Sequence, residues 1–182
     1  MDDPQQQAKR PVSALAGSYG HPLHPIFVTV PIGAWVASLV FDVASHVAGD
    51  PGFLAEGSLW LIGLGVAGAL AAAATGFLDL LAVPPGTRVF RTALVHMSLN
   101  LAVTAAYAAA FGWRLDDTGG PVAPGRIALS VAALAALTAS GFLGGKLAYR
   151  YGVRVADEKT QAEGFTRTGT APRHTADQGE NA

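Results

Sequence analysis

Residues 20–47, which read GHPLHPIFVTVPIGAWVASLVFDVASHV, decide the fold. Pro22 and Pro25 are typical of a helix start, because a proline in the first turn gives up an N–H that has no intrahelical partner there. The residues that follow are mostly small or apolar, and at about 1.5 Å per residue they cover the roughly 30 Å core of a bilayer. We therefore predict a transmembrane helix over residues 24–47, with His24 in its first turn.

Three more apolar segments follow, separated by turns rich in Gly and Pro. Thr87 can cap the third of them. Four such segments joined by short loops predict an all-α fold, an integral membrane four-helix bundle with both termini on the cytoplasmic side. The expected organisation is a polar N-terminal tail (1–20), a transmembrane domain (21–152, with spans at about 24–47, 58–83, 88–113 and 126–151) and a disordered polar C-terminal tail (153–182).

Composition narrows the range of functions. Of the 182 residues, 51% are hydrophobic and 14% are charged, against roughly 25% charged in an average soluble domain. The net charge of -1 and the lack of a basic patch argue against nucleic-acid binding. The absence of cysteine excludes disulfides, Cys-ligated iron–sulfur clusters and thiol nucleophiles. No cleavable signal peptide is expected, so the first span would itself direct the chain to the inner (plasma) membrane as a multi-pass protein.

The distribution of Lys and Arg predicts the orientation. Positive charges near helix ends favour the cytoplasmic side. The loop after the third span holds only Arg114 and Arg126, whereas eight basic residues lie near the helix ends on the opposite side of the membrane. We therefore expect the termini in the cytoplasm. The eight residues are Lys9, Arg10, Arg88, Arg91, Lys146, Arg150, Arg154 and Lys159.

Ionisable residues from several spans fall at a similar depth near the cytoplasmic face. Charged groups inside a membrane are costly, so such residues tend to be paired or to face the bundle interior. His24 and His96 are candidate ligands of haem iron or of a metal, with Asp79 as a third ligand or as the carboxylate that orients an imidazole, and with His21 as a further ligand. The structural alternative is that Asp79 pairs with nearby basic residues while His24 only caps a helix, and a proton or ion path is a third possibility. Rings more than about 10 Å apart would exclude a shared site.

Other polar residues lie within the spans. Ser38, Asp42 and His46 share one face of the first helix, and Asp42 and His46 can be satisfied by local hydrogen bonds, which favours a structural role over transport or ligation. Asn100 shares a face with His96, and Lys146 lies near the end of the fourth span. Small residues at four-residue spacing predict close helix packing: Gly68, Ala72 and Gly76 in the second span, and Gly141 and Gly145 in the fourth. Pro31 is expected to bend the first helix, and no catalytic Ser–His–Asp arrangement can be placed.

The motifs of the first three spans resemble those of a known family. The first span quoted above, a second span ending TGFLDLLAVPPGT (75–87) and a third opening RTALVHMSLN (91–100) are similar to the bacterial four-span membrane family catalogued as domain of unknown function 2231. The resemblance covers about residues 19–151. It implies a four-span membrane fold. Some relatives are joined to or encoded beside Rieske or cytochrome modules, which implies a role in redox chemistry, although the family has no assigned activity. The motif positions that it implies are His21, His24, Asp42, Asp79, His96 and Asn100.

The leading hypothesis is an integral membrane protein whose cytoplasmic-side histidines bind haem b or a transition metal, as a redox or sensing partner of another protein. The first alternative is a non-catalytic scaffold or assembly subunit that associates, with itself or others, through its small-residue helix faces. The second is a small ion or proton conductor, which the lack of a duplicated or broken-helix pattern disfavours. The bilayer is the expected partner, and the sequence favours a protein that is not an enzyme.

Overall fold

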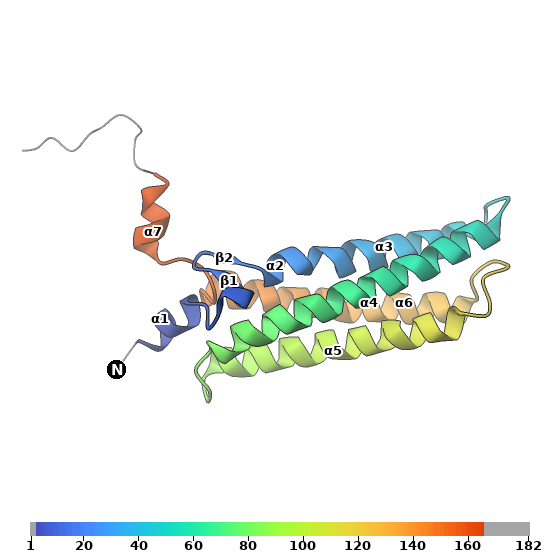
Figure 1. The fold of residues 1–182 in the computed structure, drawn as a ribbon. Coiled ribbons are helices and arrows are strands. Elements are labelled where there is room, and N and C mark those ends of the chain that lie inside the picture. The colour runs from blue at the N-terminus through green and yellow to red at the C-terminus, as the bar shows by residue number, and fades with distance from the viewer. Residues whose placement is uncertain (1–2, 166–182) are drawn as a thin grey trace, which may run out of the picture.

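Four long helices lie side by side in the computed structural model, which describes residues 3–165 (Figure 1). The bundle helices are α2 (His24–Phe27) with α3 (Thr29–Ala44), α4 (Pro51–Leu81), α5 (Arg88–Arg114) and α6 (Pro124–Gly145), which continues into the π-helical turn η2 (Lys146–Arg150). Smaller elements gather at one end of the bundle: α1 (Pro4–Lys9), η1 (Ala14–Ala16), β1 (Gly17–Ser18), β2 (His21–Pro22) and α7 (Glu158–Glu163).

Each of the four expected spans corresponds to a helix that is long and apolar enough to cross a membrane, so the predicted all-α four-helix bundle is confirmed. The second helix begins earlier than expected, at Pro51 instead of Ser58, because the side chain of Asp50 accepts a hydrogen bond from the Phe53 N–H at 3.2 Å and caps it. The predicted cap of the third span is also present, since Thr87 Oγ1 accepts from the Phe90 N–H at 3.0 Å.

The side chains are distributed as in a membrane protein. Large apolar residues such as Trp60 and Phe142 point outward and are 70% and 76% exposed. The buried positions are mostly small or weakly polar, among them Ser38, Ser58 and Ser140 at 0%. Since lipid tails are as apolar as leucine, burying large apolar side chains brings little benefit, and close packing of small residues holds such bundles together.

The helices pack in a ring: α3 on α4, α4 on α5, α5 on α6, and α6 back on α3. The first and third spans are therefore diagonal across the bundle. The small-residue stripe predicted in the second span is used for close packing, because a Cβ at Gly68 would lie 2.7 Å from Val30 Cγ1. Gly141 of the fourth span, by contrast, has no such neighbour and faces outward.

The first span is interrupted near its start. Val28 separates α2 from α3, and Pro31 follows within one turn. A proline has no N–H to donate to the carbonyl four residues earlier, here that of Phe27, so the helix is weakened where the sequence predicted a bend.

The end of the bundle that carries α1 and α7 is called the tail end, and the end with the α3–α4 and α5–α6 connections the loop end (Figure 1). Within the predicted polar N-terminal tail, residues 3–20 contain helical turns and one strand of a two-residue β-ladder in which Ser18 pairs with His21. Part of the expected C-terminal tail forms α7, and residues 166–182 of that tail lie outside the described residues.

The described parts of both termini lie at the tail end (Figure 1). This arrangement follows from an even number of spans. The cytoplasmic location of that end remains a prediction from the Lys and Arg counts.

Candidate functional site

Two of the predicted site residues, His24 of α2 and His96 of α5, face each other across the bundle near the tail end. Their ring centroids lie 6.3 Å apart and their planes are nearly perpendicular, at 89°. Both side chains are half-buried. This centroid separation is well below the roughly 10 Å above which a shared site would be excluded.

Each imidazole is anchored to the backbone of the next helix. His24 Nδ1 lies 2.9 Å from the Ala72 carbonyl oxygen of α4, and His96 Nδ1 lies 2.8 Å from the Ser140 carbonyl oxygen of α6. A carbonyl oxygen can only accept, so Nδ1 is the protonated nitrogen in both rings. In the neutral imidazole Nε2 then carries the lone pair in both rings, and on His96 the Asn100 side-chain amide lies 3.2 Å from it.

Glycines make room for both rings. A Cβ at Gly76 would lie 2.9 Å from His24 Nδ1, and a Cβ at Gly144 would lie 3.0 Å from His96 Cε1. Each glycine lies four residues after the carbonyl that accepts from the same histidine, on the same face of its helix. The two anchoring sites are thus alike, although α4 and α6 have different sequences around them.

His96 has two additional polar neighbours. Ser140 Oγ donates to the His96 carbonyl oxygen at 3.1 Å and lies 3.0 Å from Nδ1. The Asn100 side-chain amide donates to the same carbonyl at 3.0 Å and lies 3.2 Å from Nε2. We call His24, His96, Asn100 and Ser140 the histidine layer.

The other candidate ligands are not brought to this layer. His21 is exposed on the β-ladder, where its Nδ1 lies 3.3 Å from the Tyr19 carbonyl oxygen. Asp79 forms an ion pair with Arg154 at 2.7 Å, because the end of α4 meets the folded tail segment, and Lys146 lies over the Tyr151 ring. In residues 3–165 no three His, Asp or Glu side chains are grouped closely enough to hold a metal ion. The predicted four-ligand set of His21, His24, Asp79 and His96 is therefore not assembled.

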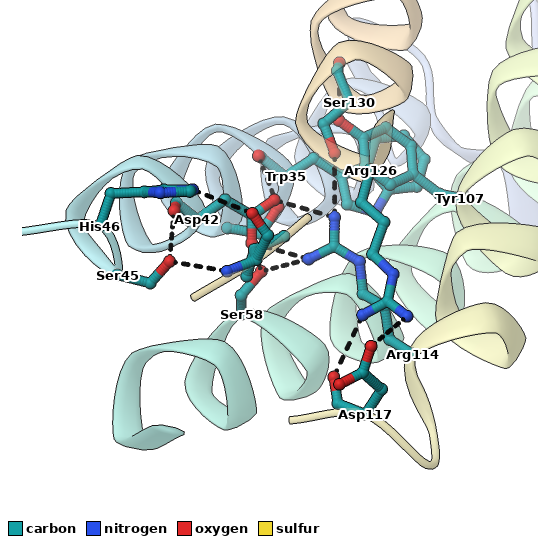
Figure 2. Close-up of polar contacts among 12 residues, drawn as sticks. Trp35, Asp42, Ser45, His46, Ser58, Tyr107, Arg114, Asp117, Arg126 and Ser130 are labelled. Atoms are coloured by element: carbon teal, nitrogen blue, oxygen red, sulfur yellow. Dashed lines mark hydrogen bonds and ion pairs between the residues drawn. The ribbon is translucent and has the colours of Figure 1, made fainter. Parts of the chain in front are cut away.

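A second polar cluster lies near the loop end and joins all four spans (Figure 2). The Arg114 guanidinium of α5 donates to both carboxylate oxygens of Asp42 of α3, at 2.7 and 2.8 Å. It also donates to Ser58 Oγ of α4 at 3.1 Å and to Ser130 Oγ of α6 at 3.4 Å, and Ser58 donates to Asp42. These four residues, the ion-pair layer, are all buried, with Asp42 at 0% and Arg114 at 2% exposure.

The expectation that Asp42 and His46 are satisfied locally is therefore wrong for Asp42, whose partner is Arg114 on the diagonal helix. His46 Nε2 donates to the Val122 carbonyl oxygen at 2.9 Å, and Ser45 Oγ accepts from the Val122 N–H at 3.0 Å (Figure 2). These two bonds hold the α5–α6 loop against the end of α3. Ser38 donates to the Trp35 carbonyl within its own helix.

An apolar layer separates the two polar ones. Trp35 and Tyr107 stack with centroids 4.2 Å apart and planes 7° apart, and Ile62 and Val103 pack with them. The Trp35 indole lies directly against Gly65, where any Cβ would collide with it. The bundle interior is therefore filled by side chains between the histidine layer and the ion-pair layer.

We did not predict Arg114, Ser58, Ser130 and Arg154 as partners from the sequence. A usable signal existed for the first of these: Asp42 and Arg114 are opposite charges near the ends of two spans that finish on the same membrane face. Isolated serines in an apolar span carry no comparable signal.

Comparison with known protein families identifies the chain. The family model described as "Predicted membrane protein (DUF2231)" matches residues 20–157. The chain belongs to this family. The match includes both histidines of the histidine layer and both charged residues of the ion-pair layer, so these features of the DUF2231 protein lie within its family domain. No curated protein and no solved structure matches the chain.

Proposed function

We propose that this DUF2231 protein binds haem b, which His24 and His96 would hold, and exchanges electrons with, or senses the state of, a redox partner at the membrane. The observation that carries the proposal is the facing pair of imidazoles with both Nδ1 atoms anchored to backbone carbonyls.

The spacing of the rings supports axial ligation. An imidazole nitrogen binds a transition metal at about 2 Å, and the ring centre lies about 1 Å further away, so two ligands on opposite sides of one metal have centroids about 6 Å apart. The observed centroid separation is 6.3 Å. Side chains from diagonal helices suit this arrangement, because they approach a common centre from opposite directions.

The anchoring of the rings supports ligation as well. Metal-binding histidines almost always donate their other ring N–H to a carbonyl or carboxylate, which fixes the ring orientation and makes the free nitrogen more basic. His24 and His96 each do this toward a neighbouring helix. Gly76 and Gly144 allow the close approach that these bonds require.

The donor set favours haem over a bare metal ion. A protein-bound zinc ion usually takes three or four protein ligands. In the described part of the chain the pair has no third His, Asp or Glu close enough to join it. Two imidazoles are sufficient for haem, since the macrocycle supplies the remaining four nitrogens, and the bound iron would supply one-electron chemistry.

Conduction is less well supported. The stacked Trp35 and Tyr107 and their apolar neighbours fill the interior between the two polar layers. An ion moving along the bundle axis would have to leave all polar contacts in this layer, at a cost of several kcal/mol or more.

Absorption spectroscopy of the purified protein tests the proposal. The protein is purified in detergent, both as isolated and after titration with haem b, and a Soret band is expected. His24→Ala and His96→Ala should each weaken or shift this band, and the double variant should abolish it. His21→Ala and His46→Ala are matched controls, because both histidines are exposed and lie outside the histidine layer. A folded wild-type protein that takes up no haem would overturn the proposal and favour the scaffold function.

A further inference from the structure

A pocket at the tail end lies outside both polar layers. It has a volume of about 290 Å³ and opens between α1, the α4–α5 turn, the first turn of α5 and the end of η2. Its walls are mostly apolar, with Ala8, Val83, Pro84 and Val89 among them, and within the described chain Arg150 is the one charged residue that lines it. Small-molecule sites usually have volumes of roughly 300–1,000 Å³, so this pocket suits a compact ligand.

The pocket lies at the level where a bilayer changes from hydrocarbon to headgroups. Two of the candidate spans end beside it, since the third begins at Arg88, between two wall residues, and the fourth ends at Arg150. Tyr149, directly before Arg150, is 91% exposed. Tyrosine is enriched at membrane interfaces, where its ring meets the apolar region and its hydroxyl meets water.

The face of α5 that borders the pocket continues into the bilayer. Thr87 lines the pocket, and Arg91 and Val95 follow at four-residue spacing on the same face of the helix. Both Arg91 and Val95 are exposed, and Val95 is accompanied by the exposed Leu94. A lipid whose acyl chains lie along this face would therefore have its headgroup at the pocket.

Positive charge gathers around the pocket. Arg150 in its wall is exposed and forms no ion pair within residues 3–165. Lys146 Nζ lies 5.6 Å from the centroid of the Tyr151 ring, which also belongs to the wall. Two cations are thus close to a mostly apolar pocket.

The nearby acids already have partners. Asp79 lies one turn before the wall residue Val83 and is paired with Arg154 at 2.7 Å. Asp3 precedes α1, and its side chain accepts a hydrogen bond from the Gln5 N–H at 2.9 Å. Neither carboxylate lines the pocket, so the guanidinium of Arg150 is left for an anionic ligand.

We propose that this pocket binds the phosphate headgroup of an anionic phospholipid, with Arg150 donating to the phosphate and the apolar walls contacting the glycerol backbone. Arginine suits phosphate, because its charge-assisted hydrogen bonds are short and strong. A membrane lipid fits better than a soluble phosphate compound, since the pocket lies at the interface and adjoins a lipid-facing helix surface. Basic residues next to a membrane span attract anionic lipids of the cytoplasmic leaflet, the side on which the tail end is predicted to lie. The proposal does not depend on haem binding.

Lipid titration of the full chain in detergent tests the proposal, with native mass spectrometry to count the bound lipids and measure their affinity. The probes are phosphatidylglycerol, which is anionic, phosphatidylcholine with the same acyl chains, which has no net charge, and glycerol 3-phosphate, which has no acyl chains. The wild type should bind one phosphatidylglycerol roughly tenfold to a hundredfold more tightly than phosphatidylcholine, the effect of hydrogen bonds from a charged group. Glycerol 3-phosphate should bind more weakly than phosphatidylglycerol.

Three variants locate the binding. Arg150→Gln should remove most of the preference for phosphatidylglycerol. Lys159→Gln is the matched control, because it removes one positive charge at an exposed position on α7, outside the pocket. It should weaken binding by less than about fivefold, the general attraction of one basic residue to anionic lipid. Val89→Trp keeps every charge but fills the pocket from its wall, and it should also abolish tight binding.

Several outcomes would overturn the proposal. Equal affinity of the wild type for the two lipids would do so, and so would a loss in Lys159→Gln as large as that in Arg150→Gln, which indicates diffuse attraction. Tight binding that persists in Val89→Trp, shown by circular dichroism to be folded, would locate the lipid elsewhere. Glycerol 3-phosphate that binds as tightly as phosphatidylglycerol would indicate a site for a soluble compound. Should Val89→Trp fail to fold, the comparison of Arg150→Gln with Lys159→Gln decides.

Discussion

Removing either charge of the ion-pair layer should destabilise the bundle strongly, because Arg114 and Asp42 are 2% and 0% exposed. Asp42→Asn leaves a guanidinium that had donated to both carboxylate oxygens at 2.7 and 2.8 Å without its counter-charge. Breaking a buried ion pair from one side typically costs about 3–5 kcal/mol. The unfolding equilibrium constant should therefore rise by roughly 10²- to 10⁴-fold.

The two single variants should differ in a predictable direction. A carboxylate left alone can be neutralised by taking up a proton, whereas a guanidinium cannot release one in a protein. Arg114→Met should therefore destabilise the protein less than Asp42→Asn does. The double variant Asp42→Leu, Arg114→Met removes both charges and should be more stable than Asp42→Asn, since replacing a whole buried pair by apolar residues is often neutral or better.

Equilibrium unfolding in mixed micelles measures these effects, with Trp fluorescence and circular dichroism as probes. Asp117→Asn is the matched control: it removes an ion pair to Arg126 at the same end of the bundle, but the Asp117 side chain is 68% exposed. That variant should lose less stability than Asp42→Asn because Arg126, although its side chain is only 8% exposed, keeps its hydrogen bonds to the Asp117 and Trp113 carbonyl oxygens. Equal losses in Asp42→Asn and Asp117→Asn would refute the reasoning, and so would a double variant that is less stable than both single variants.

Three further predictions concern packing, capping and orientation. Gly65→Ala should lower the thermal unfolding temperature, since its methyl group would collide with Trp35, while Gly112→Ala, with no atom within 4 Å, should leave it unchanged or raise it. Thr87→Ala should cost about 1 kcal/mol by removing the cap of α5, and Thr87→Ser, which restores the hydroxyl, should recover most of it in the same unfolding assay. A reporter that is active only in the periplasm should be inactive when fused to the C-terminus; strong activity from a folded fusion would reverse the orientation.

The features predictable from the sequence are those set by local pattern. The four spans follow from uninterrupted apolar length, and the cap by Thr87 follows from one hydroxyl before a helix start. The close approach at Gly68 and Gly76 follows from small residues at four-residue spacing. The spans and the cap depend on one segment and its solvent, whereas the small-residue pattern leads to close packing at Gly68 and not at Gly141, because packing also depends on which helix lies opposite.

The features that were not predictable depend on which helices face each other. Local hydrogen bonds were predicted for Asp42, yet its partner Arg114 is 72 residues away on the diagonal helix. Asp79 looked like a ligand because its depth matches that of the histidines, but Arg154 reaches it from the folded tail segment. The depth of a residue in the membrane can be predicted from its position in the sequence, whereas the neighbouring helix that its side chain faces cannot.

The two polar layers differ in the chemistry of their groups, and this difference favours different roles for them. In the ion-pair layer, both carboxylate oxygens of Asp42 accept from Arg114, and hydroxyls from two other helices complete the cluster, so its function is to hold the four spans together. In the histidine layer, each Nδ1 donates to a backbone carbonyl, Nε2 carries the lone pair, and the Asn100 amide lies 3.2 Å from Nε2 of His96. Substitutions in the two layers should therefore have different effects. In the ion-pair layer they should lower the stability of the apoprotein, and in the histidine layer they should chiefly reduce haem binding.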